Sequence, residues 1–294
     1  MSTTNESDVL RSAVRAPSVY GGRKPEEIHI PAATNIHDDE TAQRLGFRGG
    51  TIAGSIHMDQ FPPLLVEAFG QRWFETGSLS LQFKNATVEG EEVVAAIDAP
   101  SGASDEQVNA WTEALDAVDG ALVAQGTASV GNPSEPTYLH SLDLRLGDPG
   151  TLRILHDVQP GTPFHHTEAL GAAAAWMTAP IFGDDDWYQG PSPWGGAIAN
   201  PSGIVQLLRF REPFTPHIKD AVGLFGAIEI RFHAGPVFRD TTYNVTGSVV
   251  GVGDSPKSEY CWYDSHATDP DGRLVVSMRM QSRWMKASSP LYAE

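Results

Sequence analysis

The chain contains only one cysteine, Cys261, in 294 residues. A single thiol cannot form an intrachain disulfide and cannot by itself supply a thiolate metal cluster, so we interpret it as a packing residue. No apolar run approaches the length of a membrane span, and the segment from Met1 to Arg23 lacks the apolar centre of a secretory signal. We therefore expect a cytoplasmic protein with no membrane partner.

Positive charge is also scarce. The chain has 20 Lys and Arg residues against 37 Asp and Glu residues, a formal net charge of −17. Nucleic acid binding requires a positive face, and no run of basic residues provides one, so a nucleic acid partner is excluded. Any anionic substrate must be held by local basic residues or backbone amides, because the overall field repels it.

What the sequence does contain is a long internal repeat. Gly-Gly-Thr-Ile-Ala at residues 49–53 is answered by Gly-Gly-Ala-Ile-Ala at 195–199, and residues 77–88 are echoed by 226–237. Asp-Gly-Ala-Leu-Val at 119–123 is answered in the same order by Asp-Gly-Arg-Leu-Val at 271–275. Repeats at this interval indicate two similar units in tandem. We predict an N-terminal arm at 1–25, a first unit at 26–135 and a second unit at 136–294.

Each unit reads as helix followed by alternating strands, the pattern of an α+β fold. In the first unit we predict helices at 38–45 and 52–69, the second of them divided at Pro62-Pro63 and restarting with proline in its first turn. Predicted strands follow at 78–84, 93–99, 109–117 and 121–130. The second unit repeats a helix at 198–210 and strands at 227–233, 241–250, 259–266 and 274–285. This is the pattern of a tandem (double) hotdog, in which two antiparallel sheets each wrap a central helix and join edge to edge.

Residues 35–54, Asn-Ile-His-Asp-Asp-Glu-Thr-Ala-Gln-Arg-Leu-Gly-Phe-Arg-Gly-Gly-Thr-Ile-Ala-Gly, resemble the MaoC-like (R-specific enoyl-CoA) hydratase and dehydratase family. In that family a loop with Asn and His precedes a short helix, a Gly-Phe turn and a glycine that opens the central helix. The resemblance implies activity on an enoyl or 3-hydroxyacyl thioester of CoA or acyl carrier protein. It assigns His37 as general acid and base, Asn35 as a loop-ordering or substrate-orienting group, and the Gly54 amide as the oxyanion donor.

The chain departs from the family pattern at the aspartate. That residue falls at Ala32 or Ala33, and the proline between Asn and His is missing. In the second unit the matching region, 184–201, has no histidine, and Asn200 with Pro201 stands where Gly54 opens the helix of the first unit. We expect the first unit to retain the chemistry and the second to shape the substrate tunnel.

Further polar residues surround the predicted helix start. His57 is a second catalytic candidate, with a core histidine bonded to the backbone as the alternative. We predict Ser55 as a capping hydroxyl or substrate contact, because no Gly-x-Ser-x-Gly elbow makes it a nucleophile. The carboxylates at 38–40 are expected to cap a helix, and one of them could replace the missing aspartate.

The second unit adds aromatic and acidic groups. Its aromatic tract is predicted to line an apolar pocket for substrate, or to pack in the core or at an interface; it comprises Trp176, Trp187, Tyr188 and Trp194. His-His-Thr-Glu at 165–168 and the aspartates at 184–186 match no metal motif, and we predict no metal. We expect 165–168 to begin a helix that continues through 172–176. No nucleotide-binding fingerprint is present, and no redox cofactor is predicted.

Three functions fit these observations. The first is a hydro-lyase acting on the thioester. The second keeps the fold and uses the same histidine to cyclise or isomerise a polyketide-like or terpenoid intermediate. The third is a binding or scaffold subunit without chemistry. A thioesterase would need a carboxylate facing the thioester, and the sequence places none. Two fused units already form the pair that single hotdogs make by dimerising, so a monomer and a homodimer both fit.

Overall fold

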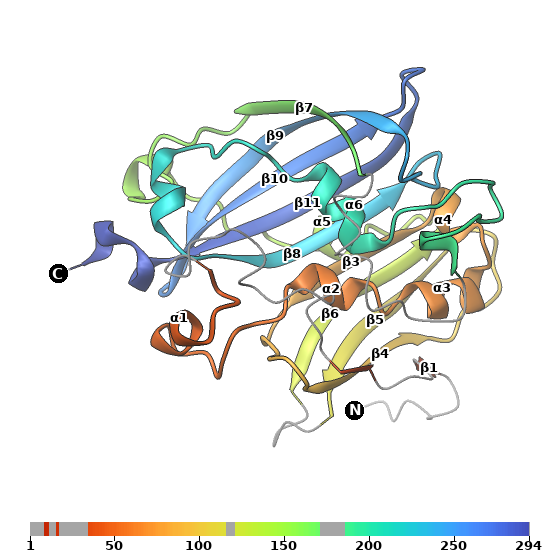
Figure 1. The fold of residues 1–294 in the computed structure, drawn as a ribbon, viewed down its shortest axis with the longest axis horizontal. Helices are drawn as coiled ribbons and strands as arrows, with labels where there is room; N and C mark the ends of the chain where they lie inside the picture. The colour runs from red at the N-terminus through yellow and green to blue at the C-terminus, as the bar shows by residue number, and fades with distance from the viewer. Residues whose placement is uncertain (1–8, 12–15, 18–34, 116–120, 171–185, 294) are drawn as a thin grey trace.

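The computed structural model describes residues 9–11, 16–17, 35–115, 121–170 and 186–293. Its main feature is one antiparallel sheet of 11 strands, in the order β1-β4-β5-β6-β3-β8-β11-β10-β9-β7, with β2 also paired to β4 (Figure 1). The strands are β1 (Val9–Arg11), β2 (Ala16–Pro17), β3 (Ser78–Phe83), β4 (Glu92–Asp98), β5 (Glu106–Ala114), β6 (Leu122–Val130), β7 (Pro163–Ala169), β8 (Gly223–Phe232), β9 (Thr242–Asp254), β10 (Ser258–Thr268) and β11 (Leu274–Met285).

The sheet is continuous across the two halves of the chain. The order β4-β5-β6-β3 is repeated in the opposite sense as β8-β11-β10-β9, and β3 and β8 pair antiparallel at the centre with Ser80 opposite Glu229. The Glu229 carboxylate accepts hydrogen bonds from the hydroxyls of Ser80 at 2.7 Å and of Thr137 at 2.6 Å. The predicted double hotdog with edge-to-edge halves is therefore confirmed.

Glycine and proline mark where the central helices of both halves begin. The predicted helix at 52–69 is divided into α2 (Gly54–Met58) and α3 (Pro62–Phe69), with Pro62 in the first turn of α3 as expected. In the second half α6 (Pro201–Leu208) also begins with proline. The central helices α2 and α6 contact each other across the junction of the two halves. The other helical turns are α1 (Asp39–Arg44), α4 (Trp73–Thr76), α5 (Tyr138–Ser141) and the short 3₁₀ turns 149–151, 186–188, 216–220, 286–288 and 290–292.

One large core lies between these helices and the sheet. It includes buried side chains from both halves, among them Trp73, Leu81, Ile228 and Tyr263. On the opposite face of the sheet, α5 buries Leu139 in a smaller group with Ala227, Tyr260 and Trp262. Because alternate residues of a strand point to opposite faces, Ala227 and Ile228 belong to the two different layers. Cys261 is buried and free, in agreement with its expected packing role.

One predicted helix is a strand. Residues 165–168 belong to β7, which pairs with β9 and places His165 opposite Thr246. Their exposure alternates between exposed and half-buried along the strand. The alternation of apolar and polar residues that predicts a strand is weak at 163–169, because the segment is short and mostly polar. A strand at the edge of a sheet can have such a sequence. The expected continuation through 172–176 lies outside the described residues. Among the described helices, none is long and apolar enough to cross a membrane.

Candidate active site

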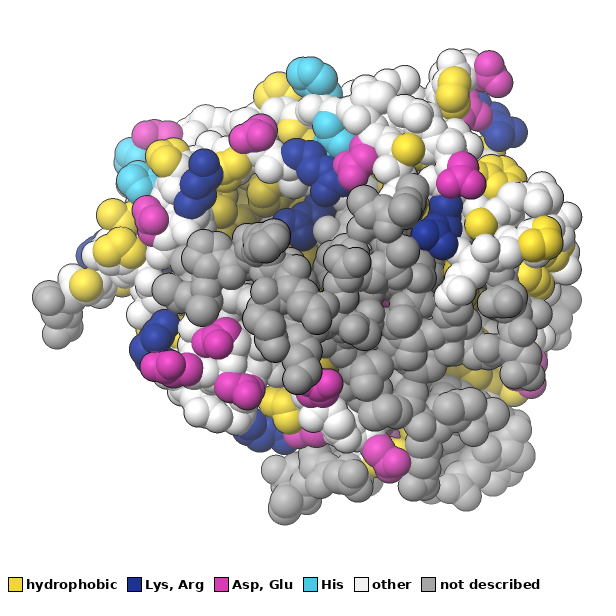
Figure 2. Space-filling model, viewed as in Figure 1, with side chains coloured by type: hydrophobic (Ala, Val, Ile, Leu, Met, Phe, Trp, Pro, Cys, Tyr) yellow, Lys and Arg dark blue, Asp and Glu magenta, His cyan; other side chains and the backbone are white. Residues whose placement is uncertain are grey.

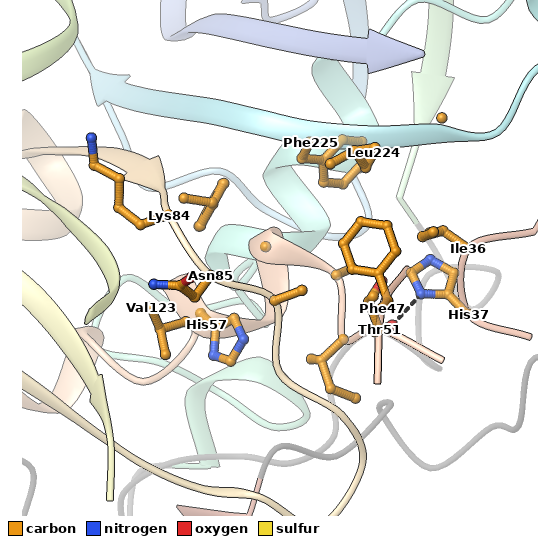
Figure 3. Close-up of a pocket in the computed structure, with 16 residues that line it drawn as sticks. Ile36, His37, Phe47, Thr51, His57, Lys84, Asn85, Val123, Leu224 and Phe225 are labelled. Atoms are coloured by element: carbon orange, nitrogen blue, oxygen red, sulfur yellow. Dashed lines mark hydrogen bonds between the residues drawn. The ribbon is translucent and has the colours of Figure 1, made fainter. Parts of the chain in front are cut away.

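A pocket of about 150 Å³ opens at the junction of the two halves (Figure 3). Its wall is made by the loop that precedes α1, the beginning of α2, the end of β3 with the loop after it, and the beginning of β8. The lining residues that bear on chemistry are His37, Thr51, Gly54, His57, Phe83 and Leu224. In Figure 3, His37 lies beside Ile36 and Thr51, and His57 lies on the other side with Asn85 and Val123. The structure thus brings together three of the residues predicted from sequence: His37, Gly54 and His57.

The imidazole of His37 has a defined orientation. Its Nδ1 donates to the carbonyl oxygen of Thr51 at 2.5 Å, since a carbonyl can only accept. This tautomer has its basic lone pair on Nε2. Burial lowers the pKa of His37, and the Thr51 carbonyl opposes that shift only in part. The ring is therefore neutral at physiological pH, which is the state in which it can act as a base.

The loop that holds His37 is fixed by local contacts. Asn35 Oδ1 accepts the backbone N–H of His37 at 3.0 Å, a contact that orders the loop. Gly50 lies directly against the loop: a Cβ at this position would be 2.2 Å from the carbonyl oxygen of His37. Because the two segments approach so closely, the Thr51 N–H donates to the carbonyl oxygen of Ile36, and the Thr51 carbonyl accepts from the imidazole of His37. Gly50 is therefore a positioning element for His37.

The carboxylates next to His37 are used locally. Asp38 caps α1 by accepting from the Thr41 N–H at 2.8 Å, and Asp39 accepts from the Gly50 N–H at 2.7 Å. Glu40 is exposed. The expectation that these residues cap a helix is confirmed for Asp38. Within the described part of the chain, the lining of the pocket contains no Asp or Glu.

His57 lies inside the pocket wall on α2. Its Nε2 is 3.0 Å from the hydroxyl of Thr87, and burial lowers its pKa to about 4. The expected backbone partner is thus a side-chain hydroxyl instead. At neutral pH the ring is uncharged, and it adds a second polar group to the pocket without adding charge.

Gly54 is the first residue of α2. The residue before it, Ala53, offers no side-chain cap; the Ile56 N–H donates to the Ala53 carbonyl at 2.9 Å, and among the described residues the Gly54 N–H has no partner. The ring of Phe83 packs on Gly54, and a Cβ there would lie 2.6 Å from a ring carbon. Ser55 does not fill its predicted roles: it sits inside the helix, its buried hydroxyl has no hydrogen bond among the described residues, and it does not line the pocket. Only a residue at the N-cap position could have capped α2.

The second half closes the corresponding position. Asn200 aligns with Gly54 in the repeat and precedes α6, whose N-terminus is occupied by Asp59 from the first half. The Asp59 carboxylate accepts from the Ser202 N–H at 2.9 Å, the Ser202 hydroxyl at 2.5 Å and the Asn200 amide at 2.9 Å. Its burial outweighs these hydrogen bonds and raises its pKa to about 7. The N-terminus of α6 is thus filled by protein, whereas that of α2 faces the pocket.

The aromatic tract packs between the halves and does not line the pocket that holds His37. Trp187, Tyr188 and Trp194 surround the ring of Phe74 at centroid distances of 6.0, 6.4 and 5.8 Å. The indole N–H of Trp194 donates to Glu75 at 2.9 Å. The packing interpretation of the tract therefore holds for these three residues, and Trp176 lies outside the described residues.

No metal centre is apparent in the described ranges, where no three His, Cys, Asp or Glu side chains are arranged to hold an ion. In β7 the adjacent residues His165 and His166 point to opposite faces of the sheet, so they cannot bind the same ion. The aspartates at 184 and 185 lie outside the described residues.

A second pocket of about 280 Å³ adjoins the first and shares Ile36, His37, Leu224 and Phe225 with it. Three basic residues line it: Arg209, Lys219 and Arg283. Among the described residues none of the three has a carboxylate within ion-pair distance: Arg209 donates to Gln206 at 3.2 Å and Arg283 to Gln281 at 2.7 Å. In the view of Figure 2, hydrophobic side chains form a hollow flanked by Lys and Arg side chains. Sequence reasoning missed this pocket, because its basic residues come from three distant segments: the residues after α6, the 216–220 turn and β11.

No family model and no curated protein matches the chain. Solved structures do. A protein from Chloroflexus aurantiacus J-10-fl, named as a MaoC domain protein dehydratase, gives a TM-score of 0.56 at 12% identity and covers 94% of each chain. A MaoC-like dehydratase gives 0.52 at 13% identity over 94% of this chain and 97% of its own. RV0216 of Mycobacterium tuberculosis, a conserved hypothetical protein with a double hotdog fold, gives 0.53 at 13% identity over 87% and 88%. The chain therefore has the double hotdog fold that these proteins share.

Proposed function

We propose that the chain is a hydro-lyase that adds water to an enoyl thioester or removes it from a 3-hydroxyacyl thioester. The observation that carries the proposal is that the His37 imidazole and the uncapped beginning of α2 at Gly54 line one pocket. A base beside an amide that can hold an enolate oxygen is what proton transfer next to a thioester carbonyl requires. The fold shared with proteins named as dehydratases supports this assignment.

We assign the following roles. In the dehydration direction the Gly54 N–H holds the thioester oxygen while His37 Nε2 removes the α-proton. The bond from the β-carbon to its hydroxyl then breaks, and the proton on His37 leaves with the hydroxide as water. In this proposal one imidazole performs both transfers, and the described lining of the pocket contains no carboxylate. We assign this chemistry to the first unit, 26–135, and the shaping of the substrate site to the second, 136–294.

We assign His57 an orienting role. With a pKa of about 4, it carries a proton in roughly one molecule in a thousand at pH 7, too few to serve as the acid. A neutral ring can still donate or accept a hydrogen bond from a polar group of the substrate.

The basic residues of the second pocket are our reason for proposing that the substrate is attached to a phosphate-bearing carrier. In a chain of net charge −17, the basic residues Arg209, Lys219 and Arg283 gather where the pocket adjoins His37. Their field offers local attraction to the phosphates of CoA or of the phosphopantetheine arm of an acyl carrier protein. We place the acyl group in the first pocket and the carrier in the second, with the thioester at His37 between them.

One observation favours a second candidate. Among the described residues, the lining of the pocket contains no carboxylate that could activate water beside His37. An isomerase or cyclase would use the same imidazole to remove a proton from one carbon and return it to another, with no change in mass. A subunit that binds without turnover is the third outcome.

The test is turnover of a panel of enoyl- and 3-hydroxyacyl-CoA thioesters, followed by mass spectrometry in H₂O and in D₂O. Gain or loss of one water that disappears in His37→Gln, but persists in the exposed control His156→Gln, is the expected result. Deuterium incorporation without a water change, together with a product of altered double-bond position, would establish isomerisation. No change with any thioester would overturn both enzyme assignments and leave the binding subunit.

A further inference from the structure

The contact between Phe83 and Gly54 limits the space beside the proposed reacting centre. Phe83 is at the end of β3, on the same face of the sheet as Leu79 and Leu81, so its ring points toward α2. Three of its ring atoms would lie 2.6 to 2.7 Å from a Cβ at position 54. The ring therefore rests directly on the first turn of α2, where the absence of a side chain admits it.

The pocket that remains is small. Its volume is about 150 Å³, and a cavity of that size holds one molecule such as benzene. Ligand pockets more commonly measure about 300–1,000 Å³. Besides Phe83, the lining includes Phe47, Val123 and Phe225, which make its surface largely apolar.

We propose that Phe83 sets the length of the acyl chain and restricts the site to chains of about four or five carbons. This rests on the proposed function, because it takes the first pocket as the acyl site. Replacing Phe83 with alanine removes a group the size of benzene and roughly doubles the apolar space beside Gly54. The space vacated by the ring would be bordered by Ala124, which pairs with Phe83 across β3 and β6, and by Leu81 on the same face of β3; both are buried.

Binding of inert ligands tests the proposal apart from turnover. Butyryl-CoA and octanoyl-CoA have neither the double bond nor the β-hydroxyl, so they bind without reacting. Each methylene that becomes buried strengthens binding about fourfold. By calorimetry, we expect the wild-type protein to bind butyryl-CoA at least about tenfold more tightly than octanoyl-CoA, and Phe83→Ala to reverse this order.

Two further variants make the result decisive. Phe83→Leu keeps a packed side chain if the alanine variant fails to fold, and we expect it to shift the preference to an intermediate length. Phe164→Ala removes an equally half-buried ring that packs on Phe210 and Phe214 away from the first pocket, and it should leave the preference unchanged.

The outcomes separate the two proposals. A reversal of chain-length preference without any gain or loss of water would support the role of Phe83 and reject the hydro-lyase. Gain or loss of water with an unchanged chain-length preference in both Phe83 variants would support the hydro-lyase and reject the role of Phe83. Failure of both ligands to bind would overturn the assignment of the first pocket to the acyl chain, and with it the role of Phe83.

Discussion

Asp59 of the first half caps the helix of the second half through Ser202. The carboxylate accepts both the backbone N–H and the hydroxyl of Ser202, at 2.9 and 2.5 Å, and Asp59 is buried. Two opposing effects meet at this contact. The donors and the helix N-terminus favour the charged form, and burial favours the neutral form. Burial prevails, and the pKa of Asp59 is raised to about 7.

This balance predicts a pH-dependent contribution from Asp59. Between about pH 4 and pH 7 the folded protein holds a proton on Asp59 that the unfolded chain has released. The stability that this proton gives is present at low pH and is lost as pH rises toward 7. The total loss in the free energy of unfolding is about 4 kcal/mol. Asp59→Asn has no such proton. Urea unfolding at pH 5 and pH 8 should show the advantage of the wild type over Asp59→Asn, about 1–3 kcal/mol at pH 5, shrinking at pH 8. If the stability advantage of the wild type over Asp59→Asn grew with pH, the hydrogen bonds of the helix cap would outweigh burial in setting the pKa of Asp59.

His57 should act in the reverse sense. Its pKa is about 4 in the folded protein against an ordinary value of 6.5, so the unfolded chain binds the proton first as pH falls. Stability from the neutral ring is present above pH 6.5 and is lost toward pH 4, by about 3 kcal/mol. His57→Gln should therefore flatten the acid side of the unfolding profile. The exposed control His156→Gln should follow the wild type, and equal slopes in all three proteins would contradict the burial of His57.

Gly50→Ala should impair the site more than the fold. The new Cβ would collide with the His37 carbonyl, so the loop must shift, and we expect kcat/KM to fall at least about tenfold while unfolding changes by about 1–3 kcal/mol. The matched control is Gly196→Ala, at the equivalent position of the repeat, where the nearest atom is a Phe238 ring carbon at 3.2 Å. Equal losses in the two variants would show that Gly50 does not position His37.

Arg209→Gln should weaken the binding of substrates on phosphate-bearing carriers and leave the binding of other substrates unchanged. Losing one charge-assisted contact raises KM for CoA thioesters about tenfold, and added salt reduces the difference. The matching pantetheine thioester, which has no phosphate, should show no change. Arg211→Gln is the control, because Arg211 is paired with Glu168. A similar rise in KM for both thioesters would place the phosphates elsewhere.

The fold was predictable because its signals are local and occur twice. Alternating strands, the Pro62-Pro63 division and the repeat of Gly-Gly-x-Ile-Ala each follow from residues next to one another. The strand β7 was missed because an edge strand needs little apolar alternation, and its partner β9 lies far along the chain. The boundaries at 25 and 135 stay predictions.

The site was predictable in part. His37, Asn35 and Gly54 lie within one short motif, and the loop contacts around them are local. The role of Phe83, the basic residues of the second pocket and the capping of α6 by Asp59 depend on contacts between distant segments, and no spacing in the sequence signals them. The aromatic tract misled for the opposite reason: its residues lie close together in sequence, but they pack around Phe74 rather than around His37.

The pairing of β3 with β8 also fixes an order of events during synthesis. Ser80 and Glu229, which meet across this pair, are 149 residues apart in the chain. The first half therefore leaves the ribosome with the edge of β3 bare, and it must wait for β8 to be made before that edge is covered. A bare, apolar edge strand is a site for wrong pairing with other chains. Until the second half has been made, the strand that becomes the centre of the finished sheet is therefore an edge at which wrong pairing can occur.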